Sequence, residues 1–245
     1  MSQAPRALIT GAARRIGACI ARQLHAQGHD LILHYRHSAT DAEQLRDALN
    51  AERAGSCRCL QADLTDMDAV AGLATAAAED GRLDLLINNA SSFYPTPVGD
   101  IDQAHWDDLV NSNLRAPFFL AQALYPQLKA TGGNIINLVD VHAERGLVGY
   151  PVYSIAKAGL KMMTLTLARE LAPEVRVNGI APGPILWPEA EAALSDTARQ
   201  AVLDKTLLAR TGRPEDIAEA VLYLSRAGYV TGQILAVDGG RSLYS

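Results

Sequence analysis

Short apolar segments alternate with helical segments along almost the whole chain, and this alternation restricts the fold more than any other feature. Runs such as Leu83-Asp-Leu-Leu-Ile are nearly continuous in apolar residues, which is typical of strands buried on both faces and paired in parallel. Repeated βα units with right-handed crossovers produce a doubly wound sheet. We therefore predict an α/β Rossmann fold, a single domain over residues 1–245 with a seven-stranded parallel sheet and helices on both faces.

The pattern also places each element along the chain. The expected strands are Ala7–Thr10, Asp30–His34, Ser56–Gln61, Leu83–Asn88, Asn134–Val139, Arg176–Ile180 and Ile234–Val237. The expected helices are Ile16–Gln27, Asp41–Ala51, Met67–Ala78, Gln103–Lys129 with a break near Pro117, Val152–Leu171 and Pro214–Ser225. Between the last two strands, the segment 184–210 is predicted to form a lid over a substrate.

Charge and composition exclude several classes of function. The net charge of −5 gives no electrostatic reason to bind nucleic acid or an anionic membrane. No apolar run approaches the ~18–20 residues that cross a bilayer. The three cysteines show no zinc-binding spacing and fit free thiols in a reducing compartment. The N-terminus leads directly into Ala-Leu-Ile-Thr-Gly, so we expect a cytoplasmic protein without a signal peptide.

The turn after the first predicted strand has the features of a dinucleotide site. Thr10-Gly-Ala-Ala-Arg-Arg-Ile-Gly17 follows that strand and opens the first helix. Gly11 permits a tight turn, and Gly17 lets the helix pack closely on the strand. Arg15 stands where a glycine is usual and lies next to Arg14, so two guanidinium groups can bind phosphate at a helix N-terminus.

The carboxyl end of the second predicted strand selects the cofactor. It reads His34-Tyr-Arg-His-Ser38, in which Arg36, His37 and Ser38 offer donors to a 2′-phosphate with no carboxylate to repel it. Asp30 opens the same strand at the opposite edge and does not take part. NADPH is therefore the expected cofactor. Asp63 and Leu64 are placed to contact adenine, and Asn89 and Ala90 to contact the cofactor after the fourth strand.

Tyr153 and Lys157 lie four residues apart, and Asp140 precedes the tyrosine by thirteen residues. Positions i and i+4 share one face of a helix, so the ammonium can lie close to the phenol. We expect this cation to lower the pKa of Tyr153 from about 10, so that the phenol acts as a general acid. Asn113, a buried asparagine in a predicted helix, is expected to anchor a water beside Lys157.

Over essentially its whole length the chain resembles the short-chain dehydrogenase/reductases, and within them the pteridine reductases. The residues that match the wider family are Thr10-Gly, Asp63, Asn88-Asn-Ala, Asn113, Tyr153-x-x-x-Lys157, Asn178, Pro182-Gly183 and Asp238-Gly-Gly. The features that match the narrower group are Arg15, His34-Tyr-Arg-His-Ser, Asn-Asn-Ala-Ser-Ser-Phe-Tyr-Pro-Thr-Pro97, and Asp140 in place of a catalytic serine.

The resemblance implies that the protein uses NADPH to reduce a dihydropterin or an oxidised pterin. It also suggests dihydrofolate as an additional substrate. Asp140 would accept hydrogen bonds from the pterin or, when protonated, pass a proton with Tyr153. An ionised Asp140 would repel a developing alkoxide, so a simple ketone fits poorly. The expected catalytic residues are Asp140, Tyr153, Lys157 and Asn113.

The expected ligand contacts follow from the same resemblance. Phe93 would stack on the pterin, Ser91 would bridge the substrate and a cofactor phosphate, and Trp187 would close over the site. The expected substrate residues are Arg15, Ser91, Phe93, Asp140, Leu147, Tyr153 and Trp187. The expected cofactor residues are Gly11, Arg14, Arg15, Ile16, Tyr35, Arg36, His37, Ser38, Asp63, Leu64, Asn89, Ala90, Ser91, Tyr153, Lys157, Pro182, Gly183 and Ile185.

Two other functions stay open: reduction of 3-oxoacyl thioesters or sugars, and non-catalytic sensing of NADPH. Asp140 speaks against the first, and the Tyr153–Lys157 pair with Asn113 speaks against the second. We also expect a homotetramer. The helix Val152–Leu171 would present Leu160, Met163, Leu167 or their neighbours outward, and the strand within 230–237 would lie at a sheet edge. The family resemblance implies the same assembly.

Overall fold

The computed structural model describes residues 4–79, 81–187 and 194–243, and its centre is one seven-stranded sheet. The strands run in the order β3-β2-β1-β4-β5-β6-β7, and every neighbouring pair is parallel. This confirms the predicted fold. The strands are β1 (Arg6–Ile9), β2 (Asp30–Tyr35), β3 (Cys57–Gln61), β4 (Leu85–Asn88), β5 (Asn134–Leu138), β6 (Arg176–Pro182) and β7 (Ile234–Val237).

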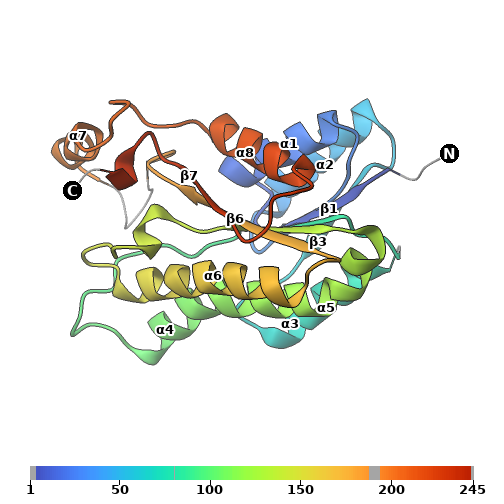
Figure 1. The fold of residues 1–245 in the computed structure, drawn as a ribbon, viewed down its shortest axis with the longest axis horizontal. Helices are drawn as coiled ribbons and strands as arrows, with labels where there is room; N and C mark the ends of the chain where they lie inside the picture. Colours follow the sequence, from blue (N-terminus) through green and yellow to red (C-terminus); the bar gives the residue numbers. More distant parts are fainter. Residues whose placement is uncertain (1–3, 80, 188–193, 244–245) are drawn as a thin grey trace.

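Helices cover both faces of this sheet (Figure 1). On one face lie α1 (Arg15–Ala26), α2 (Ala39–Glu52) and α8 (Pro214–Arg226). On the other lie α3 (Met67–Ala78), α4 (Gln103–Val110), α5 (Ala116–Thr131) and α6 (Pro151–Glu170). Shorter elements are the π-helical turn η1 (Asn111–Arg115), the 3-10 turns η2 (Val141–Ala143) and η4 (Arg241–Leu243), and the helix α7 (Asp196–Asp204).

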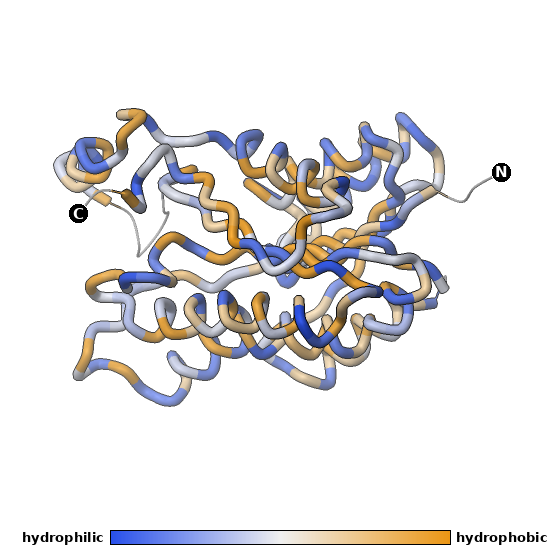
Figure 2. The backbone as a smooth tube through the Cα atoms, viewed as in Figure 1, coloured by the Kyte–Doolittle hydropathy of each residue, from blue (hydrophilic) through white to orange (hydrophobic). Residues whose placement is uncertain are grey.

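The core consists of two apolar layers, one on each side of the sheet. Figure 2 shows hydrophobic residues gathered along the strands. Successive side chains of a strand point to opposite faces, so Ile9 packs in the layer beneath α1 and α8 while Leu8 packs in the layer beneath α3 and α5. Both are fully buried. Burial of each such side chain contributes roughly 1.5–3 kcal/mol to stability.

The break expected near Pro117 is present, and one helix was not predicted. The segment expected as Gln103–Lys129 is divided by the π-helical turn Asn111–Arg115, just before Pro117. Single π turns inside helices occur often at functional sites, and this one contains Asn113. Helix α7 falls inside the predicted lid, of which residues 188–193 lie outside the described part of the chain.

The sheet brings the functional segments together at the carboxyl ends of its strands. The strand order reverses between β1, which continues to β2, and β4, which continues to β5. Ligands of open α/β sheets bind in the crevice at such a point. Within the described residues, no helix is both long enough and apolar enough to cross a bilayer.

Candidate active site

A cavity of about 450 Å³ opens at this switch point. It is lined by the glycine turn after β1, the end of β2, the loop after β3 and the loop after β4. The predicted cofactor residues in its wall are Gly11, Arg14, Arg15, Ile16, Tyr35, Arg36, His37, Ser38, Asp63, Leu64, Asn89, Ala90 and Ser91. Residues that sequence reasoning left out of this wall are Ala13, Gly17, His34, Thr65, Ser92 and Ser112.

The glycine turn fits the close approach of a dinucleotide. Gly11 has a φ of 63°, and a Cβ on it would lie 2.9 Å from the Cα atom of Ala90. A Cβ on Gly17 would lie 2.2 Å from the Gly11 carbonyl oxygen. Arg14 caps α1 without a side-chain hydrogen bond, so the helix N-terminus faces the cavity as a site for an anion. This arrangement suits the pyrophosphate of NAD(P)H.

His34 holds this turn in place, a role that its position within the NADPH-selecting segment did not reveal. Its Nδ1 atom accepts a hydrogen bond of 3.1 Å from the Gly11 backbone N–H, and its Nε2 atom lies 3.1 Å from the Ala62 carbonyl oxygen. Burial lowers the pKa of His34 to about 4, although the Ala62 bond acts the other way. The ring is therefore neutral at pH 7, with Nε2 carrying the proton that it donates to Ala62.

Arg15 adopts the backbone conformation of the glycine that it replaces. Its φ of 54° lies in the left-handed region, which costs a non-glycine residue on the order of 1 kcal/mol. Its Nη2 atom donates a hydrogen bond of 3.1 Å to the Trp187 carbonyl oxygen, so Arg15 connects the phosphate turn to the beginning of the predicted lid. The Trp187 ring in turn lies beneath the Arg199 guanidinium of α7, 5.6 Å from the ring centroid.

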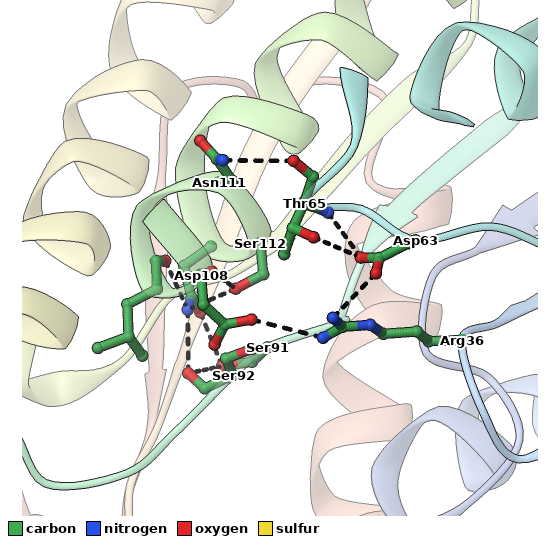
Figure 3. Close-up of polar contacts among 10 residues, drawn as sticks. Arg36, Asp63, Thr65, Ser91, Ser92, Asp108, Asn111 and Ser112 are labelled. Atoms are coloured by element: carbon green, nitrogen blue, oxygen red, sulfur yellow. Dashed lines mark hydrogen bonds and ion pairs between the residues drawn. The ribbon is translucent and has the colours of Figure 1, made fainter. Parts of the chain in front are cut away.

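The surroundings of Arg36 differ from the prediction, because two carboxylates lie beside it (Figure 3). Its guanidinium is 2.9 Å from Asp63 and 3.4 Å from Asp108 of α4. Asp108 was not predicted at this site, because it is far from Arg36 along the chain and meets it only through the fold. Asp30 lies at the other end of β2 and pairs with Arg6 and Arg53, as its position in the strand suggested.

Tyr153, Asp140 and Lys157 meet at the carboxyl end of β5 and the beginning of α6. The Tyr153 hydroxyl donates a hydrogen bond of 2.7 Å to one carboxylate oxygen of Asp140. The other oxygen accepts from the His142 backbone N–H at 2.7 Å and so caps η2. Lys157 donates from Nζ to the Leu138 carbonyl oxygen at 2.8 Å, and its Nζ atom is 5.7 Å from the centroid of the Tyr153 ring.

The predicted fall in the pKa of Tyr153 is wrong for the free protein. Burial and the adjacent Asp140 carboxylate raise the pKa of Tyr153 well above 10, while a hydrogen bond with Ser91 acts in the opposite direction. Burial also lowers the pKa of Lys157 to about 8, with Asp140 opposing that shift. The phenol is consequently protonated at neutral pH, and the pKa of Lys157 lies only slightly above neutral pH.

Asn113 is fully buried in the π-helical turn and is used to hold the loop after β4. Its amide nitrogen donates to the carbonyl oxygens of Ser92 and Leu109, at 3.0 Å each. Its side-chain oxygen accepts a hydrogen bond of 2.7 Å from the Ser91 hydroxyl. These side-chain bonds lead to Ser91 and Ser92 rather than to Lys157, so Asn113 connects the π-helical turn to the loop that carries Phe93.

Phe93, which was predicted to stack on a pterin, stacks on the side chain of Tyr150. Its ring stacks on Tyr150 with centroids 4.7 Å apart and meets Tyr153 edge-on at 4.8 Å. One aromatic face of Phe93 is therefore already covered by the Tyr150 ring. Leu147, expected beside the substrate, is half-buried, and its backbone N–H donates to Ser154 of α6 at 3.0 Å.

The residues predicted at the nicotinamide end lie outside the wall of the 450 Å³ cavity. Pro182 ends β6 beside Val237 of β7, and a Cβ on Gly183 would lie 2.6 Å from the Cα atom of Asp238. Ile185 lines a second cavity of about 550 Å³, which lies between this segment, β7 and α8. The predicted contacts of these residues with the cofactor remain predictions.

Comparison with known proteins identifies relatives of this chain. A family model described as enoyl-(acyl carrier protein) reductase matches residues 11–242. Pteridine reductase 1 of Leishmania tarentolae is 36% identical, over 98% of this chain and 97% of that protein. A 3-oxoacyl-[acyl-carrier-protein] reductase of Staphylococcus aureus is also 36% identical, over 98% and 99%. A putative ketoacyl reductase of the granaticin polyketide synthase of Streptomyces violaceoruber is 35% identical, over 98% and 97%.

Proposed function

This chain belongs to the short-chain dehydrogenase/reductase family of oxidoreductases, which use NAD(P)H, and we propose that it is an NADPH-dependent pteridine reductase. One observation carries the proposal: the phenol of Tyr153 donates to a carboxylate, Asp140, at 2.7 Å. A reductase of simple ketones needs a neutral donor to the substrate oxygen at that place. A pterin instead presents ring N–H groups and an exocyclic amine, which need acceptors.

The proposed reaction converts a C=N bond of the pterin ring to CH–NH. The reduced cofactor, when bound, supplies the hydride to the ring carbon. Tyr153, acting with Asp140, supplies the proton to the neighbouring nitrogen. Loss of that proton leaves a phenolate in a buried site, where the Lys157 ammonium is the nearby opposite charge that stabilises it.

The residues around the cavity suit NADPH in particular. Arg14, Arg36, His37 and Ser38 all line the cavity and offer donors to a 2′-phosphate. The glycine turn that His34 fixes would hold the pyrophosphate at the N-terminus of α1. Ser91 lies between this turn and Asn113 and could contact both ligands.

Reduction of 3-oxoacyl thioesters is the second candidate, because the staphylococcal reductase is as similar to this chain as the Leishmania enzyme is. The two proposals differ in their demand on Asp140. An ionised carboxylate beside a developing alkoxide would raise the barrier to ketone reduction, whereas a pterin N–H uses it as an acceptor.

The proposal is tested by incubating the purified protein with NADPH and either dihydrobiopterin, dihydromonapterin or dihydrofolate. We expect oxidation of NADPH with at least one dihydropterin. The three rates then show which side group on the pterin ring the protein prefers. No oxidation with any of them, together with turnover of an acetoacetyl thioester, would replace the proposal with the second candidate.

We further propose that the protein assembles as a homotetramer. The exposed large apolar residues of α6 are Ile155 and Met162, at 53% and 60% exposure. Of the residues expected outside, Leu160 and Met163 are buried with Val139, and Leu167 is partly buried against them. On α5, Phe118 and Phe119 are also exposed. Two apolar helix faces and the open edge of β7 supply separate self-complementary surfaces. Sedimentation at the 26.2 kDa monomer mass at micromolar concentration, with full activity, would contradict this assembly.

A further inference from the structure

Arg36 is held between two carboxylates that come from different parts of the chain (Figure 3). Its Nη2 atom lies 2.9 Å from Asp63, in the loop after β3, and its Nη1 atom lies 3.4 Å from Asp108, on α4. Arg36 and Asp63 both line the cavity assigned to the cofactor. The side chains of Arg36 and Asp108 are 40% and 26% exposed, so an ion from solvent can reach the pair.

Asp63 and Asp108 differ in how tightly each is held beside Arg36. Asp63 is fixed, because one of its oxygens accepts from both the backbone N–H and the hydroxyl of Thr65, at 2.9 and 2.7 Å. These bonds and the Arg36 charge outweigh burial, which acts in the opposite direction, and hold the pKa of Asp63 below its usual range. Asp108 makes the longer contact with Arg36, and it is therefore the partner that an incoming anion can displace.

The local charge opposes a 2′-phosphate as long as both contacts persist. One guanidinium faces two carboxylates, which leaves the group with a net negative charge. A phosphate monoester carries a charge of about −1.5 to −2 at pH 7 and binds well to a guanidinium fork that is free to receive it. Donors of Arg36 that face Asp108 have to exchange partners before they can bind the phosphate.

We infer that Asp108 is a specificity-determining residue that competes with the cofactor 2′-phosphate for Arg36. This inference rests on the proposed use of NADPH. In the free protein Asp108 occupies the place of the phosphate, and binding of NADPH replaces an internal ion pair with a ligand ion pair. NADH has a hydroxyl at that position and requires no exchange. Asp108 thus weakens binding of NADPH and NADP⁺ selectively and reduces discrimination against NADH.

The exchange does not require helix α4 to move. The junction of α4 and η1 is held independently of Arg36, because Asn111 donates to the Thr65 carbonyl oxygen at 3.3 Å. Ser112 also donates to the Asp108 carbonyl oxygen at 2.6 Å (Figure 3). Replacement of the Asp108 carboxylate by an amide of the same size therefore changes the partner of Arg36 and leaves the backbone of the site in place.

The test compares dissociation constants of NADPH and NADH for the full-length protein, measured by calorimetry without substrate. Asp108→Asn is expected to bind NADPH about two- to fivefold more tightly, the range of a partly exposed ion pair, with NADH affinity unchanged. Asp107→Asn is the matched control, since it removes the same charge from the same helix but its carboxylate bonds to Gln103, at 2.9 Å. Arg36→Gln is expected to weaken the binding of NADPH. Adding Asp108→Asn to that variant should give no further gain in NADPH affinity.

Three results would each overturn the inference: an unchanged ratio of NADPH to NADH affinity in Asp108→Asn, an equal gain in Asp107→Asn, or a gain that persists in the Arg36→Gln background. Raising the salt concentration should shrink the gain, because it screens the competing charge. These measurements need no pterin. Failure of the wild-type protein to reduce pterins would therefore refute the proposed function without changing the outcome of this test.

Discussion

The hydroxyl of Tyr153 donates a hydrogen bond of 2.7 Å to the Asp140 carboxylate. Because a phenolate at this distance from an ionised carboxylate would be repelled, the pair favours one proton on the tyrosine. Burial and the carboxylate both raise the pKa of Tyr153 well above 10. The phenol therefore carries its proton at neutral pH, as a residue that is to protonate a substrate must.

Replacement of Tyr153 by phenylalanine tests this role. Tyr153→Phe removes the proton but keeps the ring that meets Phe93 edge-on. We expect pterin turnover to fall by roughly 10²–10⁴-fold, the usual contribution of a general acid, while NADPH still binds. Steady-state kinetics and calorimetric titration of NADPH measure the two effects. Near-normal turnover would mean that solvent or Asp140 alone delivers the proton.

Asp140→Asn separates the charge of Asp140 from its structural contact. The amide oxygen can still accept from the His142 backbone N–H, so we expect the free energy of unfolding to change by less than about 1 kcal/mol. Loss of the carboxylate should lower the pKa of Tyr153 and greatly reduce pterin turnover. Chemical denaturation and pterin kinetics check the two parts. Unchanged turnover in a stable variant would make the charge of Asp140 incidental.

Lys157 gives turnover a pH dependence on the alkaline side. Burial lowers the pKa of Lys157 from 10.5 to about 8, so the ammonium is present at neutral pH and is lost as the pH rises through about 8. The cation that stabilises the Tyr153 phenolate disappears in the same range. We therefore expect kcat to decline above about pH 8. A kcat that is level from pH 7 to pH 10 would be inconsistent with this role of Lys157.

The same burial makes Lys157 costly for stability. Because its pKa is lower in the folded state, the unfolded state binds more protons between pH 8 and 10.5, and stability rises with pH in that window. Lys157→Met should be more stable than the wild type at pH 7, by about 1–3 kcal/mol after the lost bond to Leu138 is subtracted. The advantage should shrink towards pH 10.5. Denaturation at both pH values measures this; a less stable variant at pH 7 would contradict it.

His34 is predicted to support cofactor binding through Gly11. His34→Phe leaves the Gly11 N–H without its acceptor, whereas His34→Asn keeps an oxygen close to the place of Nδ1. We expect the phenylalanine variant to bind NADPH roughly 5–30-fold more weakly, the effect of one unmade hydrogen bond, and the asparagine variant to be affected less. Titration of NADPH measures this order. Equal weakening in both variants would show that the bond to Gly11 does not matter.

His34 also makes folding sensitive to acid. Its pKa of about 4 in the folded protein lies below the ordinary 6.5, so the unfolded state binds more protons between these values. The contribution of neutral His34 to the free energy of unfolding is fully present above pH 6.5 and is lost as the pH falls towards 4. His34→Phe should lose less stability than the wild type over that range. Chemical denaturation of both proteins at the two pH values measures this. An equal loss of stability in the wild type and in His34→Phe would refute the contribution of His34.

The fold, and the meeting of many predicted residues in one cavity wall, could be predicted because they depend on local pattern. Alternating apolar and helical segments fix a parallel sheet, and the sheet then brings the loops after β1, β2, β3 and β4 to one edge. The spacing of Tyr153 and Lys157 likewise survives in α6, since helical geometry is local. In these cases the nearest neighbours in sequence decide the outcome.

The errors concern contacts between distant segments. The pKa of Tyr153 depends on burial and on a carboxylate in a different loop, and the partner of Arg36 comes from α4. The stacking of Phe93 on Tyr150 joins residues separated by α4, α5 and β5. The break in the segment Gln103–Lys129 was predicted, but its π-helical form was not, and it depends on how Asn113 meets the loop after β4. None of these follows from residue type or spacing, because each requires the packed positions of two segments.

The most direct test of the pterin proposal compares kcat/KM for a dihydropterin with kcat/KM for an acetoacetyl thioester, in the wild type and in Asp140→Ser. We expect the wild type to favour the dihydropterin strongly, and we expect Asp140→Ser to lose pterin reduction so that the ratio falls. A wild type that prefers the thioester, or an Asp140→Ser variant that keeps the full pterin preference, would contradict the assignment of this site to pterins.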